Sequence, residues 1–391
     1  MSVQPINPTE GRENARALRV ALVASSYNYI RDGVALTLNR LVRYLEHHGV
    51  EVLVFAPVAE TAAIDHAGTL VPVPSIPVPG RPEYRCAFSL PRDKLAAFKP
   101  DIIHLALAPD WLGYSTIRTA RALNLPLVAS CHTRFDTYLK HYPGSSIVEG
   151  LLKRYLRFAY GAAREVYVPS GSMLDALKAD GVKSAFKLWP RGVDTNLFHP
   201  AKRSNDWRAQ HGIGAEDFVV TFVSRLVREK ELDTVVATLK LFEARGIDHH
   251  VLIVGDGPDR GILEQGLPNA IFTGFLEGEA LAKAYAASDV FLFPSETETF
   301  GNVTLEAMAS GLPAVCANAT GSRSLVVHGE TGYLETPRHA NGFAGRLAVL
   351  ARDPELRAKF AFAARERALT FSWDESMAKI LDHYRNVVAA R

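Results

Sequence analysis

A chain of 391 residues is long for a single hydrophobic core and natural for two domains of ordinary size. Its 48% hydrophobic and 22% charged residues are typical of a globular protein. The polar N-terminus lacks the apolar core of a signal peptide, and no later apolar run is as long as a membrane-spanning helix. The sequence therefore predicts a chain that does not span a membrane.

The cysteine content and the charge distribution bear on compartment and partners. Cys86, Cys131 and Cys316 have no paired spacing, so neither a disulfide framework nor a zinc site is indicated, and a reducing cytoplasm fits best. The net charge of +2 combines a basic first half with an acidic second half. This asymmetry fits an anionic lipid or substrate on one side, and it fits an ordinary solvated surface slightly better.

The chain begins with an alternation of strand and helix patterns. Residues 18–26 (LRVALVASS) predict a strand, a polar loop ends at Gly33, residues 34–45 have apolar side chains at helical spacing, and residues 50–57 (VEVLVFAP) predict a second strand. This order is typical of a parallel sheet covered by helices. Gly33 lies at the carboxyl end of the first strand, where such sheets bind ligands, although the turn alone would also account for a glycine there.

The next segment contains a candidate histidine. Residues 71–80 are too rich in proline for a central strand and predict an extended surface segment. Residues 101–107 and 126–132 return to strand character, separated by a helix over residues 111–123. His132 thus ends a strand at the ligand-binding edge of the sheet, which favours function over the structural role that is more usual for a lone histidine.

A basic amphipathic helix is predicted over residues 146–163, where Lys153, Arg154 and Arg157 lie among leucines such as Leu152 and Leu156. Such a helix can lie on an anionic membrane surface. A helix with one core face and one solvated face is the more general interpretation.

The second half repeats the alternation. Residues 217–224 predict a strand that is followed by a basic loop, in which Arg225 and Lys230 could converge on a diphosphate beside the next helix N-terminus. Residues 249–260 predict a strand and a glycine loop without the spacing G-x-G-x-x-G. The phosphate signal of that loop is weak, and a nicotinamide or flavin cofactor has no support.

The stretch PSETETFGNVTLEAMASGLPAV carries the strongest functional signal. It follows a short apolar run at residues 288–294 that predicts a buried strand, and it predicts a helix with Asn302 as N-cap. The N–H groups at that helix start can hold an anion, while Glu298 and Glu306 can accept hydrogen bonds from two polyols. From spacing alone these residues are equally compatible with solvated glutamates. The arrangement suits a nucleotide sugar.

Several of these stretches resemble one family. ETFGNVTLEA, with Glu298 and Glu306 separated by seven residues, resembles the Glu-x7-Glu motif of family-4 retaining glycosyltransferases of GT-B architecture. SRLVREKEL resembles the arginine and lysine loop of that family, and SCHTRFDTYLKHY resembles the stretch whose histidine faces the donor sugar. The resemblance covers most of the chain, and in motif it is closest to bacterial members that transfer mannose or glucose to lipids such as diacylglycerol.

The resemblance implies a fold and a domain division. We expect an α/β protein of two Rossmann-like doubly wound domains that face a cleft. A disordered tail over residues 1–18 would precede an acceptor-side domain at 19–199, and a nucleotide-sugar domain would occupy residues 200–372. The final helix, within residues 373–391, would cross back onto the first domain.

The resemblance also implies a site. It assigns catalytic roles to His132, Arg225, Lys230 and Glu298. It assigns substrate binding to Gly33, Gly255, Gly274, Phe275, Phe300, Gly301, Asn302, Val303 and Glu306. The chain has no D-x-D, H-E-x-x-H or C-x-x-C sequence, so we expect no metal and no cofactor. The leaving diphosphate would then be neutralised by protein cations and a helix N-terminus.

The expected activity is a metal-independent, retaining transfer of a hexose-type sugar from a UDP- or GDP-sugar to an acceptor hydroxyl, with a membrane lipid as the expected acceptor. The expected location is the cytoplasm or the inner face of the cell membrane, with no nucleic-acid partner. Two alternatives remain open. A nucleotide-sugar 2-epimerase would share the architecture without an acceptor surface, and a non-catalytic protein would bind the nucleotide sugar without releasing nucleotide.

Overall fold

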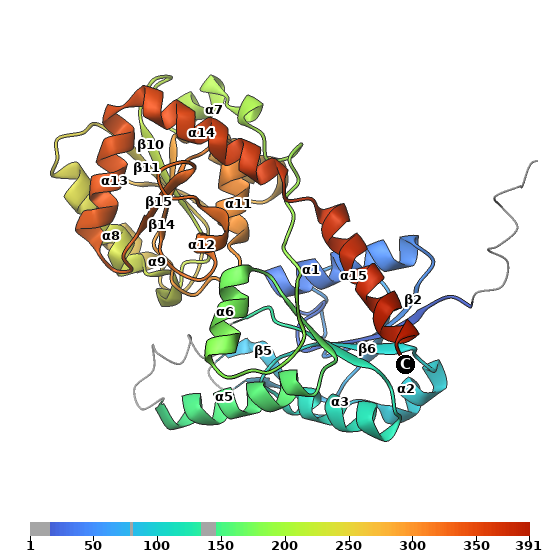
Figure 1. Cartoon of the computed structure of the whole chain (residues 1–391). Coiled ribbons are helices and arrows are strands. Elements are labelled where there is room, and N and C mark those ends of the chain that lie inside the picture. Colours follow the sequence, from blue (N-terminus) through green and yellow to red (C-terminus); the bar gives the residue numbers. More distant parts are fainter. Residues whose placement is uncertain (1–15, 79–80, 134–145) are drawn as a thin grey trace, which may run out of the picture. The chain divides into compact units, whose positions relative to one another are not determined.

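A computed structural model describes residues 16–78, 81–133 and 146–391 (Figure 1). The chain divides into two compact units, the first made of the described part of residues 1–128 with Leu381–Arg391, and the second of Ala129–Ile380. The greater part of the expected N-terminal tail, and residues 134–145 of the stretch after His132, lie outside the described residues. Within the described part no helix is long and apolar enough to cross a membrane.

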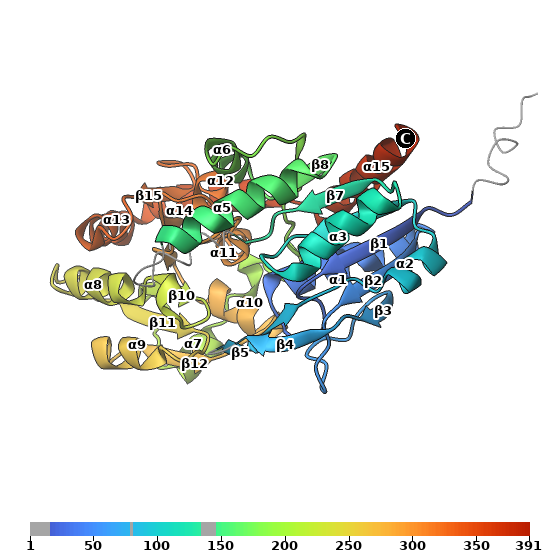
Figure 2. The same cartoon turned by 90° about the horizontal axis from the view of Figure 1, so that it is seen from below.

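The first sheet is built around three parallel strands. β1 (Arg19–Ala24) pairs with β2 (Glu51–Ala56) and with β6 (Ile102–Ala106), and Figure 2 shows β1, β2 and β3 side by side. Their side chains are almost all buried, as expected of strands covered by helices on both faces. In the described residues the full strand order is β3-β2-β1-β6-β7-β8-β9. The remaining strands of this sheet are β3 (Thr69–Pro72), β7 (Leu127–Ser130), β8 (Glu165–Val168) and β9 (Phe186–Leu188).

Helix α1 (Gly33–His47) shows how the sequence specifies the local structure. Asp32 is its N-cap, and the Asp32 carboxylate accepts a hydrogen bond of 2.8 Å from the Ala35 N–H. Gly49, with a φ of +75°, follows the C-terminal end of the helix. The apolar side chains at helical spacing are buried on one face: Leu38, Leu41, Val42 and Leu45. The other described helices in this part of the chain are α2 (Arg92–Phe98), α3 (Trp111–Ala122), α5 (Ser146–Gly161) and α6 (Gly171–Ala179).

The proline-rich segment, predicted as an extended surface segment and not as a central strand, forms short strands. It contributes β3, which pairs in parallel with β2 at the edge of the first sheet. It also contributes β4 (Ser75–Val78), which pairs antiparallel with β5 (Arg81–Ala87). An edge strand tolerates proline because one side of its backbone needs no ladder partner.

The second sheet is parallel throughout. In the described residues it runs β12-β11-β10-β13-β14-β15. Its strands are β10 (Val219–Val223), β11 (His250–Val254), β12 (Ile271–Gly274), β13 (Val290–Phe293), β14 (Ala314–Ala317) and β15 (Gly332–Glu335). The order reverses between β10 and β13, and ligands of such sheets bind at the carboxyl ends of the strands beside that point. The predicted α/β class with two Rossmann-like parallel sheets is confirmed.

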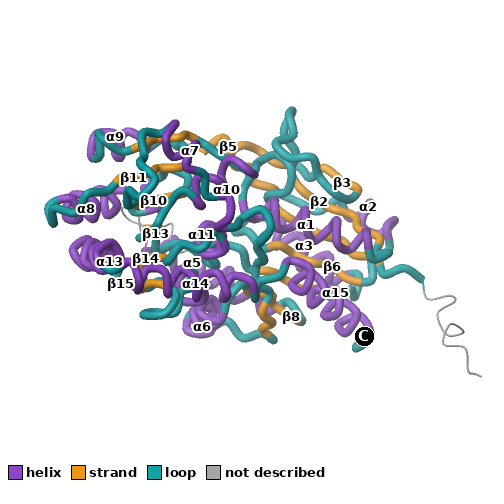
Figure 3. The backbone as a smooth tube through the Cα atoms, turned by 90° about the horizontal axis from the view of Figure 1, so that it is seen from above, coloured by secondary structure: helices purple, strands orange, loops and turns teal. Residues whose placement is uncertain are grey.

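Helices cover the second sheet. Helix α8 (Leu232–Glu243) packs against α13 (Ala340–Arg352), as Figure 3 also shows. The other helices are α7 (Asn205–Gln210), α9 (Arg260–Gly266), α10 (Gly278–Ala286), α11 (Asn302–Ala309), α12 (Ser322–Leu325) and α14 (Pro354–Leu369).

The last helix, α15 (Trp373–Ala389), ends in the first unit. There the Tyr384 hydroxyl contacts Nδ1 of His104 on β6, and both side chains are fully buried. The expected domain limits at residues 199 and 372 stay a prediction.

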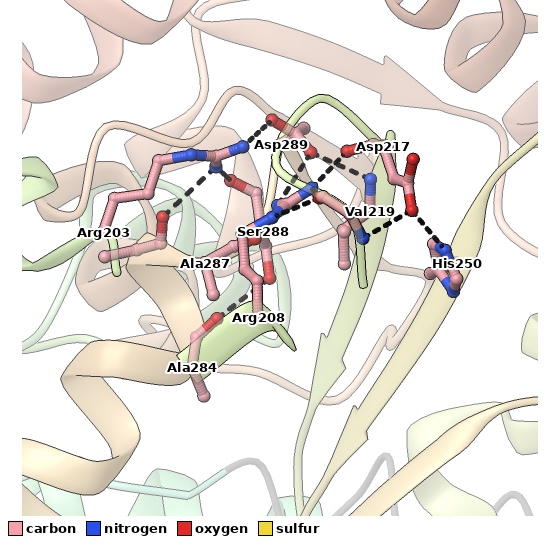
Figure 4. Close-up of polar contacts among 11 residues, drawn as sticks. Arg203, Arg208, Asp217, Val219, His250, Ala284, Ala287, Ser288 and Asp289 are labelled. Atoms are coloured by element: carbon pink, nitrogen blue, oxygen red, sulfur yellow. Dashed lines mark hydrogen bonds and ion pairs between the residues drawn. The ribbon is translucent and has the colours of Figure 1, made fainter. Parts of the chain in front are cut away.

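A fully buried arginine holds the amino ends of the second sheet together (Figure 4). Arg208 on α7 donates to the main-chain oxygens of Gly214, Asp217 and Ala287, and it lies 3.7 Å from the Asp289 carboxylate. The same carboxylate accepts a hydrogen bond of 2.9 Å from the Val219 N–H at the start of β10. Burial lowers the pKa of the Arg208 guanidinium. Each donor direction of the buried charge thus meets an oxygen, which offsets the cost of removing it from water.

We expect Arg208→Met to lower the free energy of unfolding by about 3–5 kcal/mol, because it removes the buried cation beside the Asp289 carboxylate and the donor to three carbonyl groups. Arg203→Met is the matched control. Arg203 pairs with the same carboxylate at 3.2 Å, but its side chain is 34% exposed. Its loss should cost about 1 kcal/mol or less. Urea unfolding of both variants checks this, and equal losses would contradict a dominant role for Arg208.

Candidate functional site

A lysine and a glutamate meet at the carboxyl edge of the second sheet. Lys230 ends the short 3-10 helix η2 (Arg228–Lys230), and its Nζ donates to Oε1 of Glu298 in the loop after β13. The two side chains are only 14% and 20% exposed. Because β10 and β13 are parallel neighbours, the loops that follow them emerge at the same edge. The structure therefore brings together two of the four predicted catalytic residues.

Arg225 lies at the same edge in a different environment. It follows β10 by two residues, its side chain is exposed, and its carbonyl oxygen accepts a hydrogen bond of 3.0 Å from the Val227 N–H. The next residue, Leu226, donates its N–H to the Asp256 carbonyl oxygen at 2.9 Å, which fixes the loop against the one after β11. The main chain at Arg225 is therefore held, and the residue is exposed.

The glycine loop after β11 packs backbone against backbone. Gly255 has a φ of +129°, and a Cβ atom there would lie 1.8 Å from the Ser224 carbonyl oxygen. A Cβ on Gly257, which the sequence analysis did not single out, would lie 2.4 Å from the Leu226 carbonyl oxygen. The Gly255 N–H donates to the Gly274 carbonyl oxygen at 2.8 Å, which links the loop to the end of β12. These loops have no room for side chains, so only glycine fits.

Gly274 ends β12 at this edge, and Phe275 follows it. Gly274 has a φ of +73°, and no atom lies within 4 Å of the position that its Cβ would take. The Phe275 side chain is 67% exposed. Both predicted substrate-binding residues are accordingly accessible.

The start of α11 differs from its prediction. The expectation that Asn302 caps this helix is wrong, because Gly301 is the N-cap residue, with a left-handed φ of +99°, and Asn302 is the first helical residue. Because the N-cap residue is a glycine, it has no side chain that could accept a hydrogen bond from the first N–H groups of α11. Oδ1 of Asn302 is buried and has no hydrogen-bond partner among the described residues.

Phe300 and Val303 have packing roles beside Glu298. Phe300 is buried and packs edge-on against Phe371 at 5.9 Å, while the carbonyl oxygen of the half-buried Val303 accepts from Tyr285 Oη at 3.1 Å. Sequence reasoning missed Gly321, where a Cβ would lie 2.7 Å from Cβ of Glu298. The position of this glycine just after a strand was the available signal.

Glu306 lies one turn into α11 in a different environment from Glu298. Its Oε2 accepts a hydrogen bond of 3.3 Å from the hydroxyl of Tyr285, a fully buried residue of α10. Burial raises the pKa of Glu306 to about 7, against a smaller lowering by the Tyr285 hydrogen bond. No ion pair of Glu306 occurs among the described residues. Near neutral pH this carboxyl group therefore exists in both protonation states.

His132 lies beyond β7 and is 8% exposed. Its Nδ1 lies 2.8 Å from Nη2 of Arg191, and its Nε2 lies 2.8 Å from Oγ of Ser130. Its carbonyl oxygen accepts a hydrogen bond of 2.8 Å from Thr299 Oγ1. Since Thr299 follows Glu298 directly, the main chain of His132 lies beside the Glu298 loop. Both ring nitrogens have partners within the protein.

Two serines at the start of α6 contact later parts of the chain, and one of them contacts the Glu298 loop. Ser170, the N-cap of α6, donates its hydroxyl to the Thr299 carbonyl oxygen at 3.1 Å. Ser172 contacts the Ser324 hydroxyl at 2.7 Å. No sequence motif marks Ser170, Ser172, Arg191 or Thr299 as a site residue, because each makes its contacts with residues distant in sequence.

Gly33, the remaining predicted residue, begins α1 in the first unit. Within the described residues, no group of three or more His, Cys, Asp and Glu side chains is arranged to hold a metal ion.

Comparisons with known proteins agree with this geometry. Residues 31–197 match the family model described as Glycosyltransferase Family 4, and residues 203–367 match the model described as Glycosyl transferases group 1. The chain is 34% identical over 389 residues to the sulfoquinovosyl transferase SQD2 of Arabidopsis thaliana, covering 96% of this chain and 74% of that protein. It is 35% identical over 382 residues to a GDP-mannose-dependent alpha-mannosyltransferase of Mycolicibacterium smegmatis, covering 96% and 99%.

A solved structure supports the fold. Sucrose-phosphate synthase from Thermosynechococcus elongatus superposes with a TM-score of 0.78 at 23% identity, covering 96% of this chain and all of that one. Two family models together span most of the chain, and two relatives are more than 30% identical to it over nearly its full length. This chain belongs to the family 4, group 1 glycosyltransferases.

Proposed function

We propose that this glycosyltransferase moves a hexose-type sugar from a UDP- or GDP-sugar to an acceptor hydroxyl, with retention of configuration and without a metal ion. The observation that carries the proposal is the half-buried Lys230–Glu298 pair at the carboxyl edge of β10 and β13, beside the start of α11, which has no side-chain cap. The mannosyltransferase of M. smegmatis named above uses GDP-mannose, which makes this donor the first to test.

On binding, the donor diphosphate would replace Glu298 as the partner of Lys230. A lysine whose charge is already shared with a carboxylate offers its charge to a phosphate once the carboxylate finds another partner. Glu298, released from Lys230, would accept hydrogen bonds from the sugar hydroxyls. Arg225, exposed on the same edge, and the N–H groups of α11 would add positive charge where the leaving diphosphate becomes more negative.

Other predicted residues would bind the nucleotide, and the protein would align the acceptor hydroxyl. Glu306 in its ionised form would accept from the ribose diol, and the end of β12, at Gly274 and the exposed Phe275, would contact the base. The sequence offers no dedicated nucleophile. Attack of the acceptor hydroxyl on the face that the phosphate leaves would retain configuration, and the protein would contribute alignment and charge.

A donor screen tests this function. The protein is incubated with each UDP- and GDP-sugar, with and without diacylglycerol vesicles, and free nucleotide and sugar products are measured. We expect nucleotide release that depends on the acceptor. An epimer formed from the donor alone would favour a 2-epimerase. Tight donor binding without nucleotide release would favour a non-catalytic binding protein.

The role of Arg225 predicts a large kinetic effect. Arg225→Ala should lower turnover on the order of a hundredfold, because a cation that stabilises transition-state charge is lost. Arg228→Ala is the matched control, since Arg228 lies in the same loop, with a side chain that is 73% exposed and 3.6 Å from Asp259. Turnover numbers of the two variants and the wild type decide, and near-normal turnover of Arg225→Ala removes this residue from the site.

Metal independence predicts the response to chelation. Incubation with EDTA followed by gel filtration should leave the rate of nucleotide release largely intact, because protein cations neutralise the diphosphate. The measurement is repeated with added Mg²⁺ or Mn²⁺. Loss of activity that either ion restores would contradict the proposed neutralisation.

The raised pKa of Glu306 predicts a pH dependence of donor binding. Ribose binding requires the carboxylate, so below a pH of about 7 a proton must leave before the donor binds. Donor affinity should fall as pH decreases below about 7, by up to roughly tenfold per pH unit. Calorimetric titration with GDP between pH 5.5 and 8 measures this. In Glu306→Gln the decrease of affinity below a pH of about 7 should be absent. If that decrease persists in the variant, another group causes it.

We also propose a cytoplasmic enzyme that attaches to the inner face of the membrane through α5, to reach a lipid acceptor. On this helix Leu151 is 64% exposed and Phe158 is 39% exposed, whereas Leu156 is buried and belongs to the core. Lys153 is held by Glu149 at 2.9 Å and by Asp180 at 3.4 Å. The exposed Arg154 and Arg157 would therefore carry more of the attraction to an anionic surface.

Attachment predicts salt-sensitive co-sedimentation with anionic liposomes. Each basic residue near the surface contributes about 1 kcal/mol, so the double variant Arg154→Glu, Arg157→Glu should bind several-fold more weakly. The control is Arg352→Glu with Lys359→Glu, which makes the same charge change at exposed positions of α13 and α14. Equal sedimentation of both double variants would make α5 an ordinary scaffold helix.

A further inference from the structure

A buried arginine faces the ring of His132. Arg191 is 5% exposed, and its Nη2 lies 2.8 Å from Nδ1 of His132. Its Nη1 donates to the Trp189 carbonyl oxygen at 3.2 Å, and its guanidinium carbon lies 4.7 Å from the centre of the Trp189 ring. Among the described residues no carboxylate forms an ion pair with Arg191. Its charge is thus directed at an imidazole and an aromatic ring.

The main chain around Arg191 is held on both sides. Pro190 accepts a hydrogen bond from the Ser376 hydroxyl, and the Val193 N–H donates to the Phe371 carbonyl oxygen at 3.1 Å. A Cβ on Gly192 would lie 2.3 Å from the Trp373 nitrogen. The guanidinium therefore extends from a fixed base, and the His132 ring cannot turn without losing a partner.

The chemistry of the two groups fixes the position of a proton. A guanidinium can only donate, so Nδ1 of His132 must accept from Arg191 and carries no proton. In the neutral ring the proton is then on Nε2, which lies 2.8 Å from Oγ of Ser130. A doubly protonated ring would set an N–H against the N–H groups of a buried cation. Neutral His132 with an Nε2–H is the form that satisfies both contacts.

We propose that Arg191 is a positioning residue that holds His132 in the neutral Nε2–H tautomer, so that the ring can offer a hydrogen-bond donor, and not an acceptor, to the transferred sugar or the phosphate. The proposal rests on the proposed function. In the free protein Ser130 takes this hydrogen bond, and a substrate oxygen would replace the Ser130 hydroxyl on binding. Thr299 ties the main chain of His132 to the Glu298 loop, and so places this residue beside the proposed donor site.

The first test needs no substrate. Protein labelled with ¹⁵N-histidine is studied by long-range ¹H–¹⁵N correlation, with His132→Gln identifying the His132 signals. We expect a protonated Nε2 and an unprotonated Nδ1 for His132 between pH 6 and 8. A protonated Nδ1, or a mixture of tautomers in the wild type, would overturn the proposal.

Variants then assign this state to Arg191. Arg191→Met should give mixed tautomers, while Arg191→Lys, which retains a donor, should restore the Nε2–H form at least in part. Arg365→Met is the matched control, because Arg365 donates to the carbonyl oxygens of Thr195 and Phe198 and not to a histidine. Its histidine spectrum should equal that of the wild type. If Arg191→Met fails to fold, the wild-type and Arg191→Lys spectra still decide.

Kinetics separates this inference from the proposed function. With a working donor, Arg191→Met should lower kcat tenfold or more with a smaller change in the donor KM, and Arg191→Lys should recover part of the loss. If Arg191 had a purely structural role, Arg191→Met would change stability. The kcat of Arg191→Met would then be close to the kcat of the Arg365→Met control. If no nucleotide sugar is turned over while the Nε2–H tautomer is observed, the proposed function fails and the tautomer assignment stands.

Discussion

The ion pair between Lys230 and Glu298 organises the second unit at its functional edge. It exists because β10 and β13 are parallel neighbours, so that the loops after them emerge together although the two residues are far apart in sequence. With both side chains mostly buried, each needs the other as a partner. In the proposed function, a phosphate would take the place of Glu298 beside Lys230, and a sugar diol would take the place of Lys230 beside Glu298.

The loops around this pair are built from main chain. Gly255, Gly257 and Gly321 each lie where a Cβ would come within 3 Å of a neighbouring loop. Because these loops pack through their backbones, few side chains would have to become ordered when a ligand binds. Backbone N–H groups at the edge of the sheet would then be available to an anion. A site of this kind is rigid in its frame, and its adaptable parts are the exposed Arg225 and Phe275.

The two buried arginines, Arg208 and Arg191, have different roles because their charges contact different groups. Arg208 meets carbonyl oxygens and a carboxylate at the amino ends of the strands, so its charge contributes to stability. Arg191 meets an imidazole nitrogen and an aromatic face, so its charge fixes a proton on a neighbouring ring. Burial lowers the pKa of Arg191 to about 10, which still leaves it charged at neutral pH.

The sequence by itself determined the alternation of strands and helices and the parallel sheets, because apolar periodicity is a local signal. Its motifs also marked Lys230 and Glu298 as separate candidate site residues, without indicating that they contact each other. Tertiary structure alone decided the hydrogen bond between His132 and Arg191, 59 residues apart, and the raised pKa of Glu306 beneath Tyr285. It also decided that the proline-rich segment pairs at a sheet edge and that Gly301 precedes α11. These features depend on which surfaces meet, and burial and long-range hydrogen bonds leave no periodic pattern in the chain.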